Sequence, residues 1–349
     1  MDPFPAFDLP PLSPQPLVSV VINNYNYGRF LDHAIASVLA QTYPHIELIV
    51  VDDGSTDEST DVIQAYGDQI TPILQSNGGQ GVALTVGIAQ AQGEIICLLD
   101  ADDYFHPQKV ARVVAEFQEH PTWVQLSHPW TLVNTEGLSL EHQPQKTLAT
   151  GDVRPLLCKY GKYRSALTSA LAYRQTVLAQ VLPMPELRTC ADAYLMATVP
   201  FYGPVGQIND PLMFYRLHGG NLHGSTLNLS HHIWVRQMIV TTINEMAIKM
   251  ALSQTCNIEL DADYRTFSAL QRRRISWAEA VQIMGMSLSE SIGIGRSPKE
   301  TLIRVLWGSI CLLCPDESQS VLQHGLHEYL HGKRSPKPVV PSGNDILGT

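Results

Sequence analysis

The sequence predicts an α/β fold, with a mostly parallel sheet flanked by helices and a C-terminal helical appendage. Short apolar runs of strand length alternate with segments whose apolar residues recur at helical spacing. The runs are mostly free of polar residues, as in strands that are covered on both faces. Two of the runs end in clusters of Asp, at the strand ends where ligands bind in such sheets. We therefore expect a ligand-binding crevice at the carboxyl edge of the sheet.

The chain has 349 residues, of which 44% are hydrophobic, so it can form one large domain and a smaller appendage. Its formal net charge of −10 argues against non-specific binding of nucleic acid, which requires a basic surface. The same net charge gives no support for broad electrostatic binding to anionic lipid. We expect no nucleic-acid partner.

The six cysteines form no disulfide-like framework, so a reducing cytoplasm is the simplest setting. Cys311 and Cys314 have metal-like spacing, but no second pair completes a zinc site, which favours two small apolar residues on a helix. The N-terminus is acidic and interrupted by prolines, unlike a signal peptide. No apolar run reaches the ~18 residues that are needed to cross a bilayer.

The first third of the chain repeats a strand and a helix four times. Residues 1–16 are rich in proline and are expected to be a mobile arm. The expected strands are 18–22, 46–51, 70–74 and 94–99, and the expected helices are 29–42, 57–66, the stretch from the turn 77–81 to about residue 91, and 107–119. Ser55 and Glu58 are spaced as a capping box for the second helix.

The strongest chemical signal is the group of carboxylates that follows the fourth strand. Asp100, Asp102 and Asp103 would repel one another unless a cation neutralised them, and oxygen ligands at this density suit Mg²⁺ or Mn²⁺. The sequence therefore indicates a divalent metal that holds a diphosphate. The alternative is a solvated acidic turn in which Asp103 caps the next helix.

Two further features belong to the same predicted crevice. Asp52 and Asp53 end the second strand and would meet the three carboxylates there. The glycine-rich turn 77–81 could bring backbone N–H groups to a phosphate, although an ordinary loop-to-helix turn explains it equally well. It matches neither the P-loop nor the dinucleotide fingerprint.

Four ordered segments resemble glycosyltransferase family 2, whose members use nucleotide sugars and have the Rossmann-like GT-A fold. They are Val18-Ser-Val-Val-Ile-Asn-Asn-Tyr-Asn26, Ser37-Val-Leu-Ala-Gln-Thr-Tyr-Pro44, Val50-Val-Asp-Asp-Gly-Ser-Thr-Asp57 and Gly93-Glu-Ile-Ile-Cys-Leu-Leu-Asp-Ala-Asp-Asp103. The resemblance covers about residues 16–120, with weaker echoes to about 225. It implies a GT-A domain over 17–228 and an inverting, metal-dependent transfer.

The resemblance also implies a donor site. Asp53 would hydrogen-bond the base, and Asn23 and Tyr25 would pack around it, with Tyr25 against the ring. Asp100 and Asp102 form the D-x-D pair that binds the ribose and the metal, with Asp103 as an extension, and the division of these tasks stays open. Gln80 in the glycine-rich turn belongs to the predicted nucleotide-sugar site. The chain departs from the family at Asn23, usually Pro or Thr, and at Thr85, often Asn.

For the catalytic base, the resemblance points to Asp192. The family usually has Glu-Asp at this point, but here the first position is Ala191, so Asp192 alone would take the proton from the acceptor hydroxyl. The bland alternative is a carboxylate that only caps the first turn of a helix, where the dipole favours its charge.

The segment 212–221 resembles the part that closes over the diphosphate in many relatives. The guanidinium of Arg216 would donate paired hydrogen bonds to phosphate oxygens. His218 would bind phosphate or complete the metal site with Asp102 and Asp103. His223 is a weaker candidate.

Acceptor residues are harder to predict than donor residues. Residues 165–172 could line the acceptor floor. His128 and Trp130 could stack on a sugar, but ordinary packing at a strand end is the favoured interpretation.

Residues 229–332 are expected to form helices, and 333–349 a disordered tail. Ser297 and Glu300 form a second capping box, with proline at the first helical position. Arg272–Arg274, the adjacent Trp277 and the apolar helix 302–314 could contact the inner face of a membrane. The favoured alternative is that these helices cover the sheet or form a homodimer contact.

The sequence therefore predicts a metal-dependent, inverting glycosyltransferase. It would move a sugar from a nucleoside-diphosphate sugar, with UDP favoured over dTDP, to a hydroxyl of a glycan, glycolipid or other acceptor, with Mn²⁺ or Mg²⁺ as cofactor. The alternatives are a non-catalytic sugar-nucleotide-binding scaffold and a nucleotidyltransferase. The single basic residue of the loop 23–29, Arg29, disfavours the latter.

Overall fold

The computed structural model describes residues 4, 7, 9–140, 147–185, 187, 189–219, 221, 228–314 and 317–318. The expectations for His223, for the helix beyond 318 and for the tail 333–349 fall outside these residues. The strands are β1 (Val18–Asn24), β2 (Ile46–Asp52), β3 (Thr71–Leu74), β4 (Ile95–Asp100), β5 (Tyr104–Phe105), β6 (Gln125–Ser127), β7 (Thr131–Val133), β8 (Leu171–Arg174), β9 (Val205–Gln207) and β10 (Met213–Arg216).

The main helices are α1 (Gly28–Leu39), α2 (Ser59–Tyr66), α3 (Gln80–Gln90), α4 (Lys109–Glu119), α5 (Arg154–Tyr160), α6 (Gln175–Val181), α7 (Ala191–Thr198), α8 (Leu229–Lys249), α9 (Ala262–Arg272), α10 (Trp277–Gly293) and α11 (Pro298–Leu313). No described helix combines the length and the apolar character that a bilayer crossing requires.

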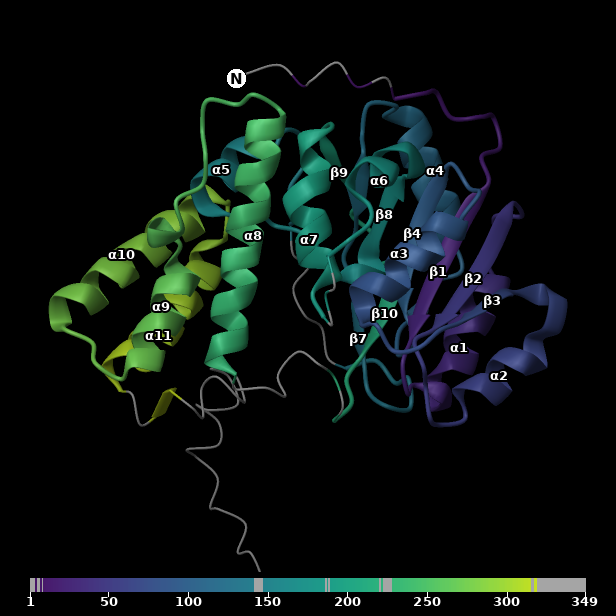
Figure 1. Ribbon diagram of the computed structural model, residues 1–349, viewed down its shortest axis with the longest axis horizontal. Coiled ribbons are helices and arrows are strands. Elements are labelled where there is room, and N and C mark those ends of the chain that lie inside the picture. The colour runs from purple at the N-terminus through teal and green to yellow at the C-terminus, as the bar shows by residue number, and fades with distance from the viewer. Residues whose placement is uncertain are drawn as a thin grey trace, which may run out of the picture.

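The predicted α/β architecture is confirmed, because helices flank a seven-stranded, mostly parallel sheet with the order β3-β2-β1-β4-β8-β6-β9 (Figure 1). The first four of these strands are mutually parallel, whereas β8 runs antiparallel to β4 and β6. A small second sheet, with the order β5-β10-β7, had no signal in the sequence. All four predicted strands and all four predicted helices of the first half are present.

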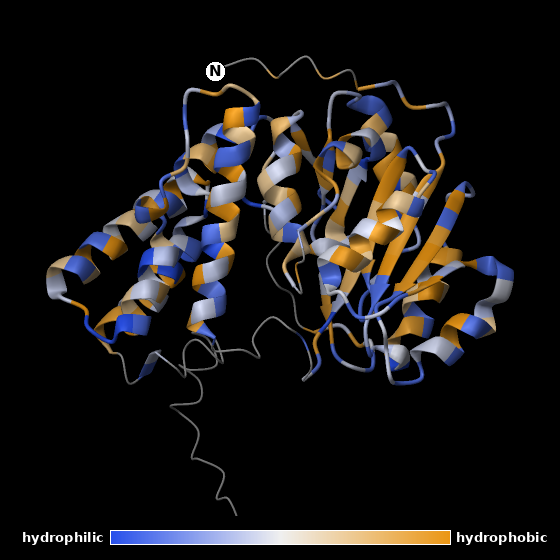
Figure 2. Cartoon of the chain, in the orientation of Figure 1, coloured by the Kyte–Doolittle hydropathy of each residue, from blue (hydrophilic) through white to orange (hydrophobic). Residues whose placement is uncertain are grey.

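The core of the sheet is aliphatic. Apart from the half-buried Ile46, the apolar side chains of β1, β2 and β4 are fully or almost fully buried, and the strands are largely hydrophobic in Figure 2. Helix α3 lies unusually close to this layer, because a Cβ on Gly87 would come within 2.5 Å of Val21 and 2.9 Å of Val51. The tight packing of apolar surface holds the carboxyl ends of the strands in fixed positions.

Residues 9–16 do not form the mobile arm that was expected. Leu9 and Leu12 pack against the core, the Ser13 hydroxyl donates to Glu94 at 2.5 Å, and the Tyr43 hydroxyl donates to Pro16 O at 2.7 Å. Glu94 directly precedes β4, so this segment crosses the amino edge of the sheet. Proline-rich composition predicted mobility, but these long-range contacts hold the segment in place.

The capping box predicted for α2 is wrong, because Glu58 is the N-cap residue and makes no side-chain capping bond. The Ser55 hydroxyl instead donates to Asp52 at 2.6 Å. Asp57 instead bonds the backbone at the start of two helices, since its carboxylate accepts from Ser59 N at 3.0 Å and from Gly28 N at 2.9 Å. The second predicted capping box, Ser297 with Glu300 at the start of α11, is confirmed.

The C-terminal helices divide into two parts. Helix α8 packs against α7 and buries Ile239, Ile243 and Ala247 in the main core. Helices α9 to α11 lie beyond α8, on the side away from the sheet, and have only small apolar clusters of their own (Figure 1). Several ion pairs join these three helices to the rest of the chain, as described below.

Candidate functional site

The parallel register brings the polar ends of three strands together. Asn24 of β1 lies beside Asp52 of β2, and Asn23 lies beside Asp100 of β4. Asn24 donates to Asp52 at 2.7 Å, so the two strand ends are also joined through their side chains. The prediction that these acidic strand ends share one edge of the sheet is therefore confirmed.

Asp53 organises the glycine-rich turn. Its buried carboxylate accepts from the backbone N–H groups of Gly78 at 2.8 Å and Gly79 at 2.7 Å, and from the side chain of Gln75 at 2.7 Å. The turn is thus held against the acidic edge by a carboxylate, a role that the sequence analysis did not assign to Asp53.

The three carboxylates of the D-x-D stretch lie in different environments. Burial, and next the charge of Asp102, raise the pKa of Asp100 to about 7. Burial, followed by the charges of Asp102 and Asp100, also raises the pKa of Asp103 well above its usual range. The geometry therefore crowds negative charge at one buried point, as the sequence predicted, and a cation bound there would relieve the repulsion.

Asp103 faces the protein interior. Its two oxygens accept from the Ser169 hydroxyl at 2.6 Å and from Arg216 N at 3.1 Å, and the residue is 1% exposed. Asp102, Asp103 and His218 do not bring three ligand atoms within 4.8 Å of one another. This geometry favours a positioning role for Asp103 over the metal-ligand role that was predicted.

The sequence placed Ser169 in the predicted acceptor floor but gave no sign of its contacts with the D-x-D stretch, and Lys109 is a site residue that it missed. The Ser169 hydroxyl also accepts from Asp100 N at 3.0 Å, so it ties the end of β4 to Asp103. Lys109 is fully buried, donates to Ser169 O at 2.5 Å and lies 3.5 Å from the centre of the Phe105 ring. Burial lowers the pKa of Lys109 to about 7. The spacing of α4 gave no sign that a lysine in its first turn would be buried.

Gln80 connects the acidic edge to the helix that carries Asp192. Its amide N donates to Asp100 at 3.1 Å, and its amide oxygen accepts from Ala191 N at 3.3 Å, at the start of α7. Asp192 lies in the first turn of α7, as predicted, and its charge contributes to the raised pKa of Asp100. The structure thus brings the predicted base close to the predicted donor site.

His218 meets the D-x-D stretch at Asp102, where its Nε2 lies 3.0 Å from the Asp102 carboxylate. Its ring packs against Phe30, with centroids 4.9 Å apart, and against Tyr27 at 5.5 Å. Burial, followed by the charge of Asp102, raises the pKa of Tyr27 to about 12. His218 and Asp102 are therefore held as a pair by aromatic packing.

Arg216 is buried and bonded inward. Its guanidinium donates to Asp102 O at 3.0 Å and to Thr135 O at 2.7 Å, and it lies 2.9 Å from His33 Nδ1. These contacts fix the loop that carries Asp102, which the sequence did not suggest. The phosphate-binding role of Arg216 stays a prediction.

The Asp102–His218 pair is the candidate position for a divalent cation. A carboxylate oxygen and an imidazole nitrogen 3.0 Å apart form a mixed donor set that suits Mn²⁺, and the surrounding negative charge favours any cation. We therefore keep Asp102 and His218 as the candidate metal ligands.

The remaining predicted residues were assigned either to the donor site or to the acceptor. Tyr25 is 47% exposed at the edge of the sheet, as a residue that packs on a ligand ring would be, and the buried Oδ1 atom of Asn23 has no hydrogen-bond partner among the described residues. His128 is buried, and burial holds its pKa well below the usual range, in agreement with the favoured packing interpretation. The predicted acceptor floor includes Ser169, whose contacts are to Asp100 and Asp103.

These observations define an α/β protein with a ligand site at the carboxyl edge of its sheet. Residues 19–181 match the family model described as glycosyl transferase family 2. An uncharacterized glycosyltransferase of Nostoc is 32% identical over 305 residues, which cover 84% of this chain and 94% of the relative. The chain therefore belongs to glycosyltransferase family 2, and it is a glycosyltransferase that uses nucleotide sugars.

Two further comparisons agree. The glycosyltransferase GlyG of Streptococcus pneumoniae is 34% identical over 240 residues, which cover 64% of this chain and 77% of GlyG. The crystal structure of residues 1–349 of Staphylococcus aureus TarS in complex with UDP-GlcNAc superimposes with a TM-score of 0.55. That match has 18% sequence identity and covers 90% of this chain and 92% of the TarS chain. It supports the predicted GT-A fold. Family membership also removes the nucleotidyltransferase alternative.

Proposed function

We propose that this chain transfers a sugar, with inversion, from a nucleoside-diphosphate sugar to a hydroxyl group of a glycan, glycolipid or other acceptor. The observation that carries the proposal is the Gln80 bridge, which links Asp100 of the acidic edge to the first residue of α7. One amide thereby brings the carboxylate of Asp192 close to the predicted donor site. Burial is the main cause of the raised pKa of Asp100, and the charges of Asp102 and then Asp192 add to it.

In the proposed donor site, Asn23, Tyr25 and Asp53 surround the base, and Asp100 binds the ribose. A UDP-sugar is the favoured donor and a dTDP-sugar the second choice, and TarS, which shares the fold, was crystallised with UDP-GlcNAc. The glycine turn that Asp53 holds offers backbone N–H groups near the diphosphate. The six free cysteines support the reducing cytoplasmic setting that was expected.

Asp102 and His218 would hold Mn²⁺ or Mg²⁺. When bound, the cation supplies positive charge to the leaving diphosphate. Asp192 takes the proton from the acceptor hydroxyl while that oxygen attacks the anomeric carbon, and the carbon–oxygen bond to the diphosphate breaks. No nucleophile of the chain intervenes, so the configuration at the anomeric carbon inverts. Ser169, Asp103 and Arg216 keep the D-x-D stretch in position.

The test combines donor binding with donor hydrolysis. UDP-, dTDP- and GDP-sugars are titrated by calorimetry with and without Mn²⁺, and release of the nucleoside diphosphate is followed for any donor that binds. We expect metal-dependent binding of one pyrimidine donor and slow hydrolysis. Asp192→Asn should keep the binding and lower turnover by about 10²–10⁴-fold, the range for a lost general base.

Asp210→Asn is the matched control, because Asp210 is an exposed acid that pairs only with the half-exposed Arg112 in the described structure. It should change neither binding nor turnover. Turnover that survives in Asp192→Asn would reject this residue as the base. Metal-dependent binding without any turnover in the unmodified chain would favour the non-catalytic scaffold.

A further inference from the structure

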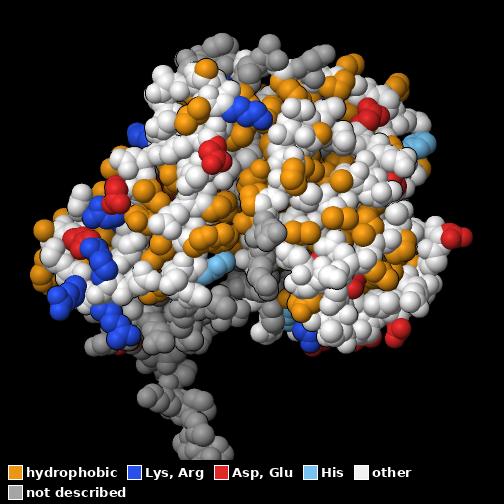
Figure 3. All heavy atoms as spheres, in the orientation of Figure 1, with side chains coloured by type: hydrophobic (Ala, Val, Ile, Leu, Met, Phe, Trp, Pro, Cys, Tyr) orange, Lys and Arg blue, Asp and Glu red, His pale blue; other side chains and the backbone are white. Residues whose placement is uncertain are grey.

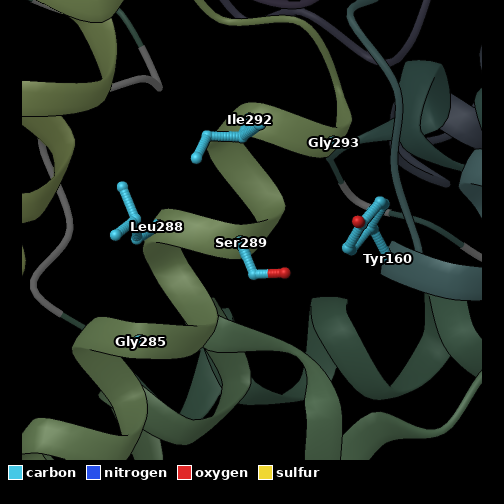
Figure 4. Close-up of a pocket in the computed structure, with 6 residues that line it drawn as sticks. All are labelled: Tyr160, Gly285, Leu288, Ser289, Ile292 and Gly293. Carbon is cyan, nitrogen blue, oxygen red and sulfur yellow. The ribbon is translucent and has the colours of Figure 1, made fainter.

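Helices α10 and α11 expose several large apolar side chains to the solvent. On α10 these are Trp277, Val281, Leu288 and Ile292, which are 74%, 60%, 45% and 66% exposed. At 100° per residue, the four positions fall within about 60° of one another around the helix. Figure 4 shows Leu288 and Ile292 pointing to the same side of α10. They form a continuous apolar stripe along one side of the helix.

Helix α11 carries a second stripe. Leu302, Leu306 and Leu313 are 59%, 45% and 36% exposed, and their positions fall within about 40° around the helix. Beside α10 there is also an open depression of about 410 Å³, lined by Tyr160, Gly285, Leu288, Ser289, Ile292 and Gly293 (Figure 4). It shares no residue with the acidic edge. Apolar patches of this extent mark an interaction surface.

The charge of this region is opposite to that of the whole chain. Residues 261–314 contain seven Lys and Arg against five Asp and Glu, a net charge of +2, whereas the chain as a whole carries −10. All five acids are buried or half-buried, and the fully exposed charged residues are all basic, namely Arg272, Arg273, Arg274 and Lys299. Figure 3 shows Lys and Arg side chains prominent at the lower left, where α9 to α11 lie.

Most of the exposed basic charge is not neutralised within the protein. Arg272 pairs with Glu279 at 2.5 Å, but Arg273, Arg274 and Lys299 form no ion pair with any residue that the structure describes. Arg273 and Arg274 stand four and three positions before Trp277 in the chain. An aromatic ring that follows free arginines at the start of an apolar stripe is typical of a helix that lies in a membrane interface.

We propose that the exposed side of α10 and α11, defined by Trp277, Val281, Leu288, Ile292, Leu302 and Leu306 with the flanking arginines, docks on an anionic lipid membrane. The net charge of the whole chain gave no support for binding to lipid, because it averages a basic region with an acidic remainder, although Arg272–Arg274 and Trp277 marked this region in the sequence. Charge complementarity selects lipid as the occupant, because the exposed arginines that flank the apolar stripe match anionic headgroups. The proposal does not depend on any catalytic assignment.

The test uses the full chain and vesicles of phosphatidylcholine, either alone or mixed with phosphatidylglycerol, in a flotation assay at low and high salt. We expect binding to the anionic vesicles, weaker binding at high salt, and little binding to the neutral ones. Arg273→Gln with Arg274→Gln should reduce the partition coefficient by about 25-fold, at about fivefold for each charge near an anionic surface. Trp277→Ser with Ile292→Ser should reduce it at least ~10-fold.

Ile248→Ser is the matched control for the apolar variant. Ile248 is 73% exposed and lies on α8, so its loss removes an exposed apolar side chain like Ile292 outside the proposed docking side. The control should bind vesicles as well as the unmodified chain does.

Three results would overturn the proposal. The first is an absence of binding to anionic vesicles. The second is a dimer in solution, detected by light scattering, that the Trp277→Ser, Ile292→Ser variant separates into monomers, because a second copy would then cover the side. The third is a melting temperature that falls in this variant as it does for a core mutation, because another segment of the chain would then cover it.

Discussion

The sheet and helices α9 to α11 are stabilised by different physical means. β1, β2 and β4 bury mostly aliphatic surface, whereas buried charges take part in the contact between the C-terminal helices and the rest of the chain. Lys162 Nζ lies 2.5 Å from Asp263, 3.0 Å from Glu290 and 3.6 Å from Asp261. Arg236 and Arg304 pair with two of these acids.

This difference separates two tasks. Apolar packing is insensitive to pH and holds the strand ends that carry the candidate site, while the ionic cluster specifies where the C-terminal helices attach. Asp261, Asp263 and Glu290 have the spacing of a metal site, but the ammonium group of Lys162 lies among them. The segment that begins at Lys162 leads on to Ser169, so the attachment point and the candidate site are seven residues apart.

The largest expected effect is that of Lys162→Met. It leaves three carboxylates in a buried position without their central ammonium, and it should lower the free energy of unfolding by about 3–5 kcal/mol, as the loss of one partner from a buried ionic group does. Urea unfolding measures the change. Lys299→Met removes an exposed lysine that forms no ion pair with the residues the structure describes; it is the control and should change little.

The pH dependence sharpens this prediction. Carboxylates that have lost their cation bind protons more readily in the folded state, so the penalty of Lys162→Met should shrink as the pH falls. A penalty that is constant between neutral and acidic pH would show that the lysine acts through packing and not through charge.

Ile96→Val tests the other region. Ile96 is fully buried in β4, and the removal of one methyl group should cost about 0.5–1.5 kcal/mol, measured by the same urea unfolding. Because no charge is involved, the loss should be the same across the pH range. If it followed the pH as the Lys162 variant does, the two regions would not be separable in the way described here.

The smallest effect at neutral pH is that of Glu300→Gln. Glu300 accepts two hydrogen bonds from Arg164, at 3.0 and 3.1 Å, and it also completes the capping box of α11. Gln can still cap, and the ion pair is partly exposed, so the cost should be roughly 0.5 kcal/mol.

Acid should reveal the role of this ion pair. The hydrogen bonds from Arg164 lower the pKa of Glu300 from 4.5 to about 2. A depressed folded pKa means that the ionised group stabilises the fold above its unfolded pKa, and that this contribution is lost as the pH falls from about 4.5 towards 2. Melting curves across this window should fall less steeply for Glu300→Gln than for the unmodified chain. Parallel curves would contradict the prediction.

The parts of the fold that could be predicted are those with local signals. Apolar runs marked β1, β2 and β4, helical spacing marked α1 and α4, and the order of strands and helices implied that Asp52 and Asp100 meet at one edge. The Ser297 capping box was also readable, because all its members lie within four residues.

The parts that could not be predicted depend on contacts between distant residues. Ser169 reaches Asp103 across 66 positions, and Lys162 reaches Glu290 across 128. The presence of a serine or a lysine in a sequence does not predict which distant residue it will contact. The Ser55–Glu58 pattern failed because Ser55 bonds instead to Asp52, three positions before it, and to the more distant Asn24 on the neighbouring strand.

The course of residues 9–16 has a practical consequence. They run along the amino edge of the sheet and, with Ser13 bonded to Glu94, reach the side opposite the acidic carboxyl edge (Figure 1). A tether joined ahead of residue 9 would therefore meet the described part of the chain on the side opposite the acidic carboxyl edge. On a sensor chip or bead, the protein would be oriented with its candidate crevice towards the solution, so that the same preparation could be probed with sugar nucleotides and with bulky acceptors.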